Sequence, residues 1–247
     1  MLKVYSKTDI GKVRNSNQDY LISGNFEDGS VWAVVCDGMG GANGGNIASE
    51  IAARVISSRL CESYNSDMNA DEIEDMFSCA ISEANSVVYY YACKNPDLLG
   101  MGTTVVAAIV KDKKIFVSHV GDSRAYIINK KEIKQLTHDH SVVQVLIDQG
   151  KITQEEAKKD PRKSIITRAV GVTDEVYDDF CECDLKNTDC ILICSDGLSN
   201  YVEEQCMISE LFSNLNDDPA QKLVEIANEN GGGDNISVVI ICRDKQN

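Results

Sequence analysis

Four aspartates stand where an apolar stretch of the chain begins or ends, and each lies beside a glycine. Asp37, Asp122 and Asp196 directly follow or closely follow such a stretch, and Asp234 closely precedes a fourth. Short apolar runs of this kind are typical of buried strands, and glycine at their ends lets the backbone and ions approach closely. Aligned strands would gather the carboxylates on one rim. The sequence therefore favours folds in which several strands end at a common edge.

The simplest interpretation of any single Asp-Gly pair is a turn. Four such junctions favour a functional interpretation, because clustered carboxylates repel one another and have raised pKa values unless cations neutralise them. Sites made only of oxygen ligands suit Mg²⁺ or Mn²⁺ better than zinc or copper. We therefore expect a two-metal site bridged by Asp37 and Asp196, in which a deprotonated water is the nucleophile.

The remaining pattern predicts an α+β chain with antiparallel sheets. Helical apolar stripes cover residues 47–60 and about 71–91, one directly after the other, and the strands on either side are joined by short turns. This order lacks the regular alternation of a doubly wound parallel sheet. No linker or repeat divides the chain, so we expect one domain over residues 1–247. The strands are expected at residues 20–24, 31–36, 104–110, 115–120, 125–128, 191–195 and 236–242, with later helices near 203–215 and 219–229.

The charge balance argues against two classes of partner. Lys and Arg total 24 against 39 Asp and Glu, which gives a formal net charge of −15. Nucleic acids and anionic membrane surfaces both select for basic patches, so we expect neither as a partner. The apolar runs are far shorter than the roughly 20 residues of a membrane helix, and the N-terminus lacks an apolar signal core. We therefore expect a cytoplasmic protein.

The chain has 10 cysteines, the densest group being Cys181, Cys183, Cys190 and Cys194. Structural zinc favours pairs of cysteines set in turns, whereas Cys190 and Cys194 flank an apolar run that resembles a buried strand. We favour reduced thiols that pack as small apolar side chains over a zinc site.

Arg14 is the cation that stands out in the polar segment of residues 8–19. Taken alone, it is most simply the partner of a surface acid. A planar guanidinium also matches a pair of phosphate oxygens, so a role in binding phosphate beside the metals is the alternative. Other phosphate and acyl chemistry is less favoured, because the chain has neither a G-x-x-x-x-G-K-[ST] loop nor a G-x-S-x-G elbow.

Taken together, seven motifs in order resemble the metal-dependent protein serine/threonine phosphatases of the protein phosphatase 2C type, in their short bacterial form. The resemblance covers essentially the whole chain, and it implies an α-β-β-α sandwich with two antiparallel sheets and a helical pair outside each. The motifs are Asp9-x-Gly11-x-x-Arg14-x-x-Asn17-Gln18-Asp19, Asp37-Gly38-Met39-Gly40-Gly41, Gly102-Thr103-Thr104, Gly121-Asp122-Ser123-Arg124, Thr167-Arg168-Ala169-Val170-Gly171, Ser195-Asp196-Gly197 and Gly233-Asp234-Asn235.

The resemblance also implies a site. It assigns two Mn²⁺ or Mg²⁺ ions and a third, weaker metal site, and it gives Arg14 the substrate phosphate. Asn235 is expected to support the site. The implied metal ligands are Asp37, Asp196, Asp234 and the carbonyl of Gly38 for the two ions, Asp19 through water, and Asp122 together with Asp196 for the third.

The implied reaction is direct attack of metal-activated water on a phosphoserine or phosphothreonine ester, without a phosphoenzyme. Phosphoproteins are the expected partners of this monomer, which would oppose a serine/threonine kinase in the same cytoplasm. The polar segment of about residues 139–168 would form a flap beside the site. Two rival functions remain: a catalytically dead binding module, and a hydrolase of small phosphate esters.

One position departs from the family pattern. Many bacterial relatives continue Asp-Gly-Met-Gly-Gly with histidine, a candidate general acid, and here that residue is Ala42. General acid catalysis is worth roughly 10²–10⁴-fold where it operates. The chain has 3 histidines. We expect a core role for His119, and for His138 and His140 a loop role at least as readily as a catalytic one.

Overall fold

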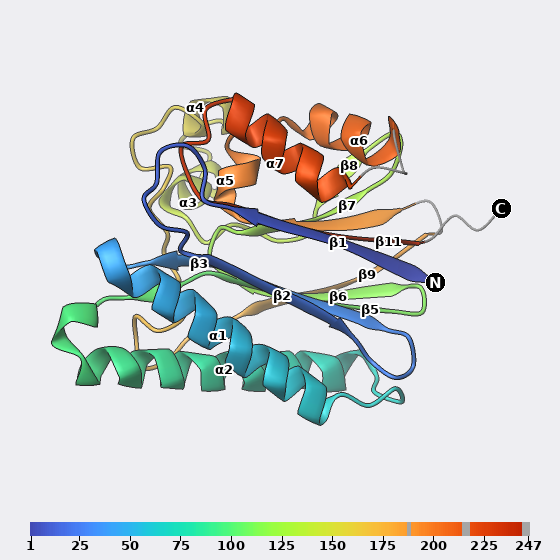
Figure 1. The fold of residues 1–247 in the computed structure, drawn as a ribbon, viewed down its shortest axis with the longest axis horizontal. Coiled ribbons are helices and arrows are strands. Elements are labelled where there is room, and N and C mark those ends of the chain that lie inside the picture. The colour runs from blue at the N-terminus through green and yellow to red at the C-terminus, as the bar shows by residue number, and fades with distance from the viewer. Residues whose placement is uncertain (187–188, 214–217, 244–247) are drawn as a thin grey trace.

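Two antiparallel sheets face each other, and helices cover both outer faces (Figure 1). The computed structural model describes residues 1–186, 189–213 and 218–243, apart from the side chains of residues 42, 43 and 213. The predicted α+β class with its four-layer sandwich is confirmed. Within the described part of the chain, none of the helices is both long and apolar enough to span a membrane.

The first sheet, named the β3 sheet, is covered by two long consecutive helices, α1 (Gly41–Ser63) and α2 (Ala70–Lys94). A short 3-10 turn, η1 (Pro96–Leu98), follows them. The strand order is β2 (Asp19–Asn25), β3 (Val31–Met39), β5 (Val105–Lys111), β6 (Lys114–Val120) and β9 (Asp179–Asp184), and β4 (Gly102–Thr103) pairs with the end of β3.

The second sheet, named the β11 sheet, is covered by helices from the C-terminal part of the chain. Its strand order is β1 (Leu2–Asp9), β11 (Ile236–Arg243), β10 (Cys190–Cys194), β7 (Arg124–Ile128) and β8 (Ile133–Gln135). The covering helices are α5 (Asp196–Ser199), α6 (Glu204–Ser213) and α7 (Pro219–Glu229). Two further helices, α3 (Val142–Asp148) and α4 (Gln154–Ala157), lie in the segment that joins β8 to β9.

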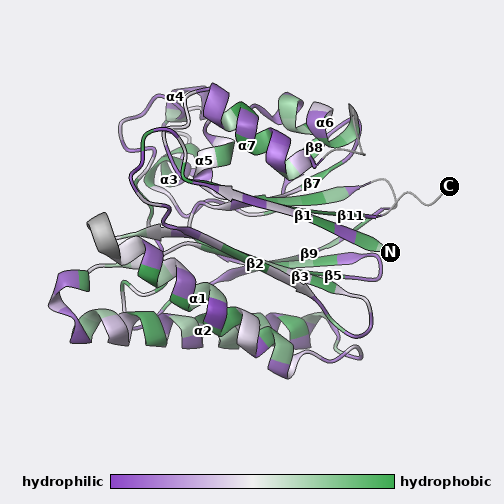
Figure 2. Ribbon diagram, viewed as in Figure 1, coloured by the Kyte–Doolittle hydropathy of each residue, from purple (hydrophilic) through white to green (hydrophobic). Residues whose placement is uncertain are grey.

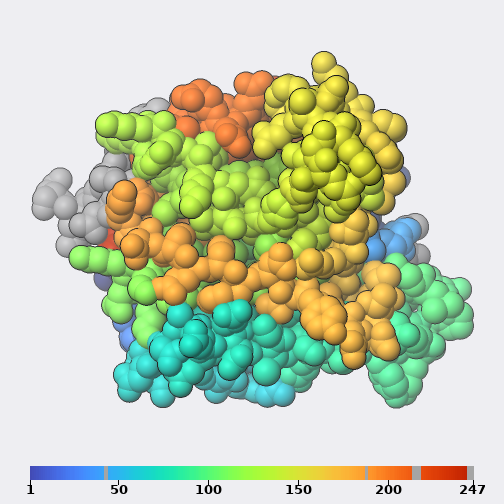
Figure 3. Space-filling model, turned by 180° about the vertical axis from the view of Figure 1, so that it is seen from behind, coloured from blue at the N-terminus to red at the C-terminus, as the bar shows by residue number. Residues whose placement is uncertain are grey.

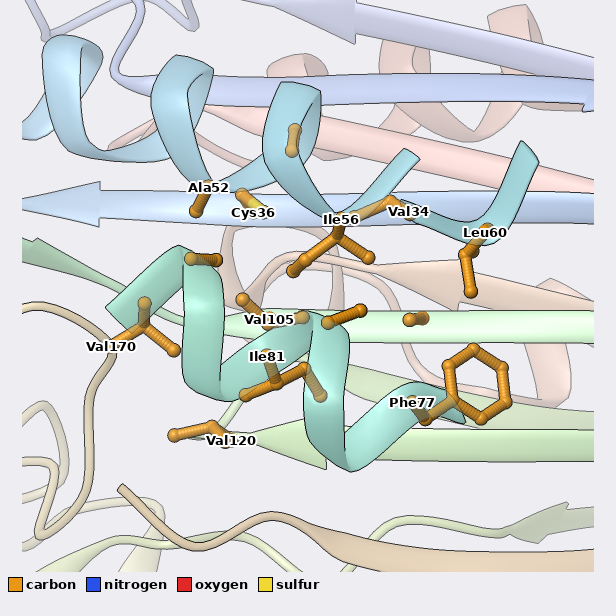
Figure 4. Close-up of a cluster of buried hydrophobic side chains, with 14 of the residues drawn as sticks. Val34, Cys36, Ala52, Ile56, Leu60, Phe77, Ile81, Val105, Val120 and Val170 are labelled. Carbon is orange, nitrogen blue, oxygen red and sulfur yellow. The ribbon is translucent and has the colours of Figure 1, made fainter. Parts of the chain in front are cut away.

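The molecule has three apolar layers, one between the sheets and one between each sheet and its helices. They form because side chains alternate between the two faces of each strand. In β3, Val34 and Cys36 pack under α1 and α2, whereas Ala33 and Val35 face the β11 sheet. Successive side chains of a strand point to opposite faces, so an uninterrupted apolar run supplies two layers at once. Figure 4 shows the outer layer, in which Ile56 of α1 and Phe77 and Ile81 of α2 lie over the strands. Polar residues occupy the outward faces of the helices (Figure 2).

Local signals fix the ends of the second long helix. The side chain of Asn69 accepts the N–H of Glu72, whose carboxylate accepts the N–H of Asn69, so a capping box starts α2. The helix ends at Lys94, directly before the Asn95-Pro96 pair that the sequence marks as a break.

The first long helix begins earlier than its apolar stripe predicts, at Gly41 instead of residue 47. The early turns contain Gly44 and Gly45, which usually indicate a loop. They are helical here because α1 packs backbone against backbone on β3: a Cβ on Gly45 would collide with Gly38. Close packing thus outweighs the poor helix propensity of glycine.

Candidate active site

The two sheets end together, and the aspartates meet there. Strands β3 and β6 run in the same direction because both are antiparallel to β5, so Asp37 on β3 and Asp122 after β6 lie at one edge. Asp196 follows β10 and Asp234 precedes the antiparallel β11, at the matching edge of the other sheet. All four residues line one cleft of about 530 Å³. The rim expected from the sequence therefore draws two carboxylates from each sheet.

Asp19 lies beneath this rim. It is paired directly with Asp37 across β2 and β3, and it is buried at 7% exposure. Its Oδ2 accepts the hydroxyl of Ser195 at 2.7 Å, and that hydroxyl oxygen in turn accepts the N–H of Ser237 at 3.0 Å. Its Oδ1 is buried and lacks a hydrogen-bond partner among the described residues. A buried acceptor without a donor is costly, and it marks a place for a water or cation.

Burial gives these carboxyl groups unusual proton affinities. It raises the pKa of Asp19 to about 7 against the hydrogen bond from Ser195, and the charges of Asp196 and Asp234 add to the rise. Burial and the charge of Asp196 raise the pKa of Asp122 to about 7 as well. The pKa values of Asp37 and Asp196 are also raised, first by burial and then by neighbouring carboxylates. Divalent cations are the counter-charge that such an oxygen-only cluster fits.

Threonines of β4 and its neighbour hold Asp37 in place. The hydroxyl of Thr104 accepts the N–H of Asp37 at 3.0 Å, and the hydroxyl of Thr103 donates to the Asp37 carbonyl at 2.9 Å. Thr104 Oγ1 also lies 2.7 Å from Ser123 Oγ, next to Asp122. The Gly-Thr-Thr motif thus positions two rim aspartates, a role that sequence reasoning did not assign.

Arg14 reaches the rim from the N-terminal loop. Its Nη2 donates to Asp234 Oδ2 at 2.8 Å, and 48% of the side chain is exposed to the cleft and solvent. Asn235 fixes the loop: its amide donates to the carbonyls of Ile10 and Ser16, and its oxygen accepts the N–H of Gln18. The structure therefore brings Arg14 and Asn235 to the site that the sequence predicted for them, with Asn235 as the anchor.

Two rim glycines are required by neighbouring backbone. A Cβ on Gly38 would collide with the carbonyl of Gly45, and a Cβ on Gly197 would collide with the carbonyl of Asn235. The sequence reasoning assigned these glycines to the approach of backbone and ions. The structure shows tight packing of chain against chain, of β3 against α1 at Gly38 and of the turn after β10 against the start of β11 at Gly197.

The predicted flap begins and ends beside Asp122. The guanidinium of Arg124 donates to the Asp139 carboxylate from Nε at 3.0 Å and from Nη2 at 2.6 Å. The N–H of His140 donates to the Gly121 carbonyl at 2.9 Å, and the N–H of Thr167 donates to the His140 carbonyl at 2.7 Å. The segment between these ties forms a yellow lobe at one corner of the molecule (Figure 3). It contributes residues 164 and 166 to the lining of the cleft.

Two of the three histidines, His119 and His140, pack against each other at the base of the flap. His119 is buried, and its Nε2 lies 2.9 Å from the His138 carbonyl, which confirms the expected core role. His140 stacks on His119, accepts the N–H of Gly121 at Nδ1, and brings Nε2 to 3.2 Å from Asp179 Oδ2. Burial lowers the pKa of His140. His138 is exposed and pairs with Asp148. The side chain of Ala42 lies outside the described residues.

The cysteines that suggested a zinc alternative do not converge. Cys190 and Cys194 are buried in β10, whereas Cys181 and Cys183 lie half-buried in β9 of the opposite sheet. All four are free thiols, and burial raises the pKa of Cys181 to about 11. The preference for packed thiols over zinc agrees with this placement.

Comparison with known proteins gives consistent matches over nearly the whole chain. A family model described as "Protein phosphatase 2C" matches residues 12–227. "Serine/threonine phosphatase stp" of Listeria monocytogenes is 40% identical over 241 residues, which cover 96% of this chain and 94% of that protein.

Two solved structures are similar in fold and sequence. The serine/threonine phosphatase Stp1 from Staphylococcus aureus has a TM-score of 0.92 and 34% identity, over 99% of this chain and 96% of the other. The catalytic domain of the serine threonine protein phosphatase PstP, in complex with 2 manganese ions, has a TM-score of 0.84 and 30% identity, over 98% and 97%.

Proposed function

Because the chain belongs to the protein phosphatase 2C family and is a protein serine/threonine phosphatase, we propose that it releases phosphate from phosphoserine and phosphothreonine by direct attack of water at phosphorus. The observation that supports this most strongly is the meeting of Asp37, Asp122, Asp196 and Asp234 in one cleft beside Arg14. No nucleophilic side chain is needed in this scheme, so no phosphoenzyme forms.

Divalent metal is part of the proposal, and the residues present fit it. The unpartnered Oδ1 of Asp19 and the raised pKa values of the rim carboxyl groups both indicate a place for positive charge. When bound, Mn²⁺ or Mg²⁺ would neutralise the carboxylates and lower the pKa of water. Asp37, Asp196, Asp234 and the Gly38 carbonyl would hold two ions, with Asp19 acting through water, and Asp122 with Asp196 would hold a third, weaker one.

The chain's own residues would bind and orient the phosphate. Arg14 is half exposed, so its guanidinium has donors free of protein contact that can face a pair of phosphate oxygens. Its ion pair with Asp234 keeps the side chain over the rim. Asn235 holds the loop on which Arg14 stands, and Ser195 donates its hydrogen to Asp19, so that the Asp19 carboxylate keeps a fixed orientation.

The same proposal extends to organisation and partners. The chain acts as one catalytic domain over residues 1–247, with a flap of about residues 139–168, and works as a monomer in the cytoplasm. Its substrates are phosphoproteins, and it opposes a serine/threonine kinase. The binding-module alternative is disfavoured because all the carboxylates and Arg14 are in place at the cleft.

A comparison of substrates tests the proposal against hydrolysis of small phosphate esters. Purified protein with Mn²⁺ is given phosphothreonine peptides, sugar phosphates and p-nitrophenyl phosphate. The proposal expects metal-dependent release of phosphate from the peptides with higher kcat/KM than from the sugar phosphates. The reverse order would favour a small-molecule esterase, and no turnover with metal bound would favour a binding module.

A further inference from the structure

A second, smaller hollow of about 260 Å³ opens beside the aspartate cleft. Met39 and Ile166 line both hollows, so the second lies directly beside the first. Its other walls come from the end of the flap and the loop that follows it, within residues 167–177. We name it the flank pocket. A protein chain whose phosphate occupies the aspartate cleft would lie next to this pocket.

The lining of the flank pocket is mostly apolar, in contrast to the acidic cleft. Met39, Ala169, Val172, Val176 and Tyr177 all contribute to it. Tyr177 is 72% exposed and Val172 is 39% exposed. Large apolar side chains that remain in water beside a substrate cleft regain favourable free energy when another apolar group covers them.

Contacts within the protein orient the walls of the pocket. The hydroxyl of Tyr177 donates to the Glu175 carboxylate at 3.0 Å. The flap end is tied to the β3 sheet by Arg168, which donates to Asp179 at 2.6 Å. Val172 packs directly over Gly102 of β4, where a Cβ would collide with it. The contact of Val172 with Gly102 thus gives the pocket one wall that is set by packing, while Tyr177 and Arg168 remain exposed at its edge.

Resting on the proposed function, we propose that the flank pocket binds one apolar side chain of the substrate protein, close in sequence to the phosphorylated serine or threonine. Its volume is below the roughly 300–1,000 Å³ of clefts that enclose drug-sized ligands, which fits a single side chain. The pocket would thus discriminate among phosphoproteins by the side chain next to the phosphorylated residue, while the aspartate cleft would bind only the phosphoester.

Paired phosphothreonine peptides test this inference. One set carries leucine at each flanking position in turn, and the matched set carries serine there. The readout is the ratio of kcat/KM for the leucine and serine peptides, measured with Mn²⁺ for the full chain and its variants. At one flanking position, we expect the wild type to favour leucine by roughly tenfold, the scale at which an apolar pocket discriminates. Tyr177→Ala should bring this ratio close to one.

The matched control is Tyr90→Ala, which removes another exposed tyrosine, 60% exposed and located on α2, outside the lining of both hollows. It should keep the wild-type ratio. Equal hydrolysis of all peptides by the wild type, or a tenfold preference that survives in Tyr177→Ala, would overturn the flank pocket alone. If no phosphopeptide is hydrolysed while p-nitrophenyl phosphate is, the proposed protein phosphatase function fails, and this inference with it.

Discussion

Arg14 faces two ways, toward Asp234 at 2.8 Å and toward the open cleft. Phosphate binding would use the donors that Asp234 leaves free. Arg14→Ala should therefore lower kcat/KM for phosphopeptides by roughly 10- to 150-fold, the equivalent of about 1.5–3 kcal/mol for a hydrogen bond to a charged group. Steady-state kinetics with Mn²⁺ measure the loss.

The control for Arg14 is Arg54→Ala, which removes an exposed arginine paired with Glu50 on α1. It should leave the kinetic constants unchanged. Arg14→Lys should recover only part of the lost activity, because an ammonium cannot bind two phosphate oxygens in the plane of a fork. Full activity in Arg14→Ala would show that the guanidinium only pairs with Asp234.

Asn235 shows how one buried amide joins two segments distant in sequence. At 4% exposure it binds Ile10, Ser16 and Gln18 through three hydrogen bonds. Asn235→Ala would leave those backbone groups unpaired, so we expect the free energy of unfolding to fall by about 2–3 kcal/mol. Urea denaturation measures it. Asn129→Ala, in the exposed β7–β8 turn, should cost less than half as much.

At the scale of elements, two contacts hold the ends of the flap: Arg124 with Asp139 at its start, and Thr167 with the His140 carbonyl at its end. Asp139 receives two donor groups from Arg124 at the flap's start, next to Asp122. Asp139→Asn weakens this charged pair and should loosen the segment, because a buried ion pair is strongly destabilised when one partner loses its charge. Limited proteolysis within residues 142–165 should become faster.

Glu155→Gln is the comparison for the flap. It removes the charge of an ion pair with Lys158 inside the same segment, and both of these side chains are mostly exposed. Exposed pairs contribute little. Proteolysis should therefore stay at the wild-type rate, and equal rates for both variants would mean that the Arg124–Asp139 tie does not hold the flap.

Three of the strands that the sequence analysis missed share one property. β1, β8 and β9 all lie at sheet edges. Edge strands bury less and mix charged with apolar residues, as in Asp179–Asp184, so their periodic signal is weak. Central strands such as β3, β5 and β11 are buried on both faces, and their apolar runs predicted them within a few residues.

The same physical reason explains what the sequence could predict of the site. Asp37, Asp122, Asp196 and Asp234 stand at the ends of central strands, so their convergence followed from the strand pattern. The positioning roles of Thr103 and Ser195 depend on contacts between segments far apart in the chain. No spacing in the sequence encodes such contacts.

At the scale of the whole molecule, the rim makes stability depend on pH and metal together. The folded protein holds protons on Asp19 and Asp122 up to about pH 7, whereas unfolded aspartates lose them near their ordinary value of 3.8. Between those values the folded state binds more protons, so the free energy of unfolding of the metal-free protein falls as pH rises. Each tenfold difference in proton affinity is worth about 1.4 kcal/mol.

Thermal unfolding in chelator at about pH 5.5 and about pH 7, both within that window, tests this. The Tm of the metal-free protein should be lower at the higher pH. Added Mg²⁺ should raise Tm more at the higher pH than at the lower one, because the cations replace the lost protons. Asp19→Asn should reduce the slope. A metal-free Tm that rises with pH, or an unchanged slope in Asp19→Asn, would contradict the account of a charged rim.

In the function that we propose, the carboxylates gathered from both sheets support metal-dependent phosphate release. The most direct measurement is hydrolysis of a phosphothreonine peptide and of p-nitrophenyl phosphate, with Mn²⁺ and with chelator, by the wild type and by Asp37→Asn. We expect chelator to abolish turnover and Asp37→Asn to lower kcat by at least about a hundredfold. Asp148→Asn, at an exposed aspartate outside the cleft, should retain full activity. Undiminished turnover in chelator, or in Asp37→Asn with Mn²⁺, would contradict the claim.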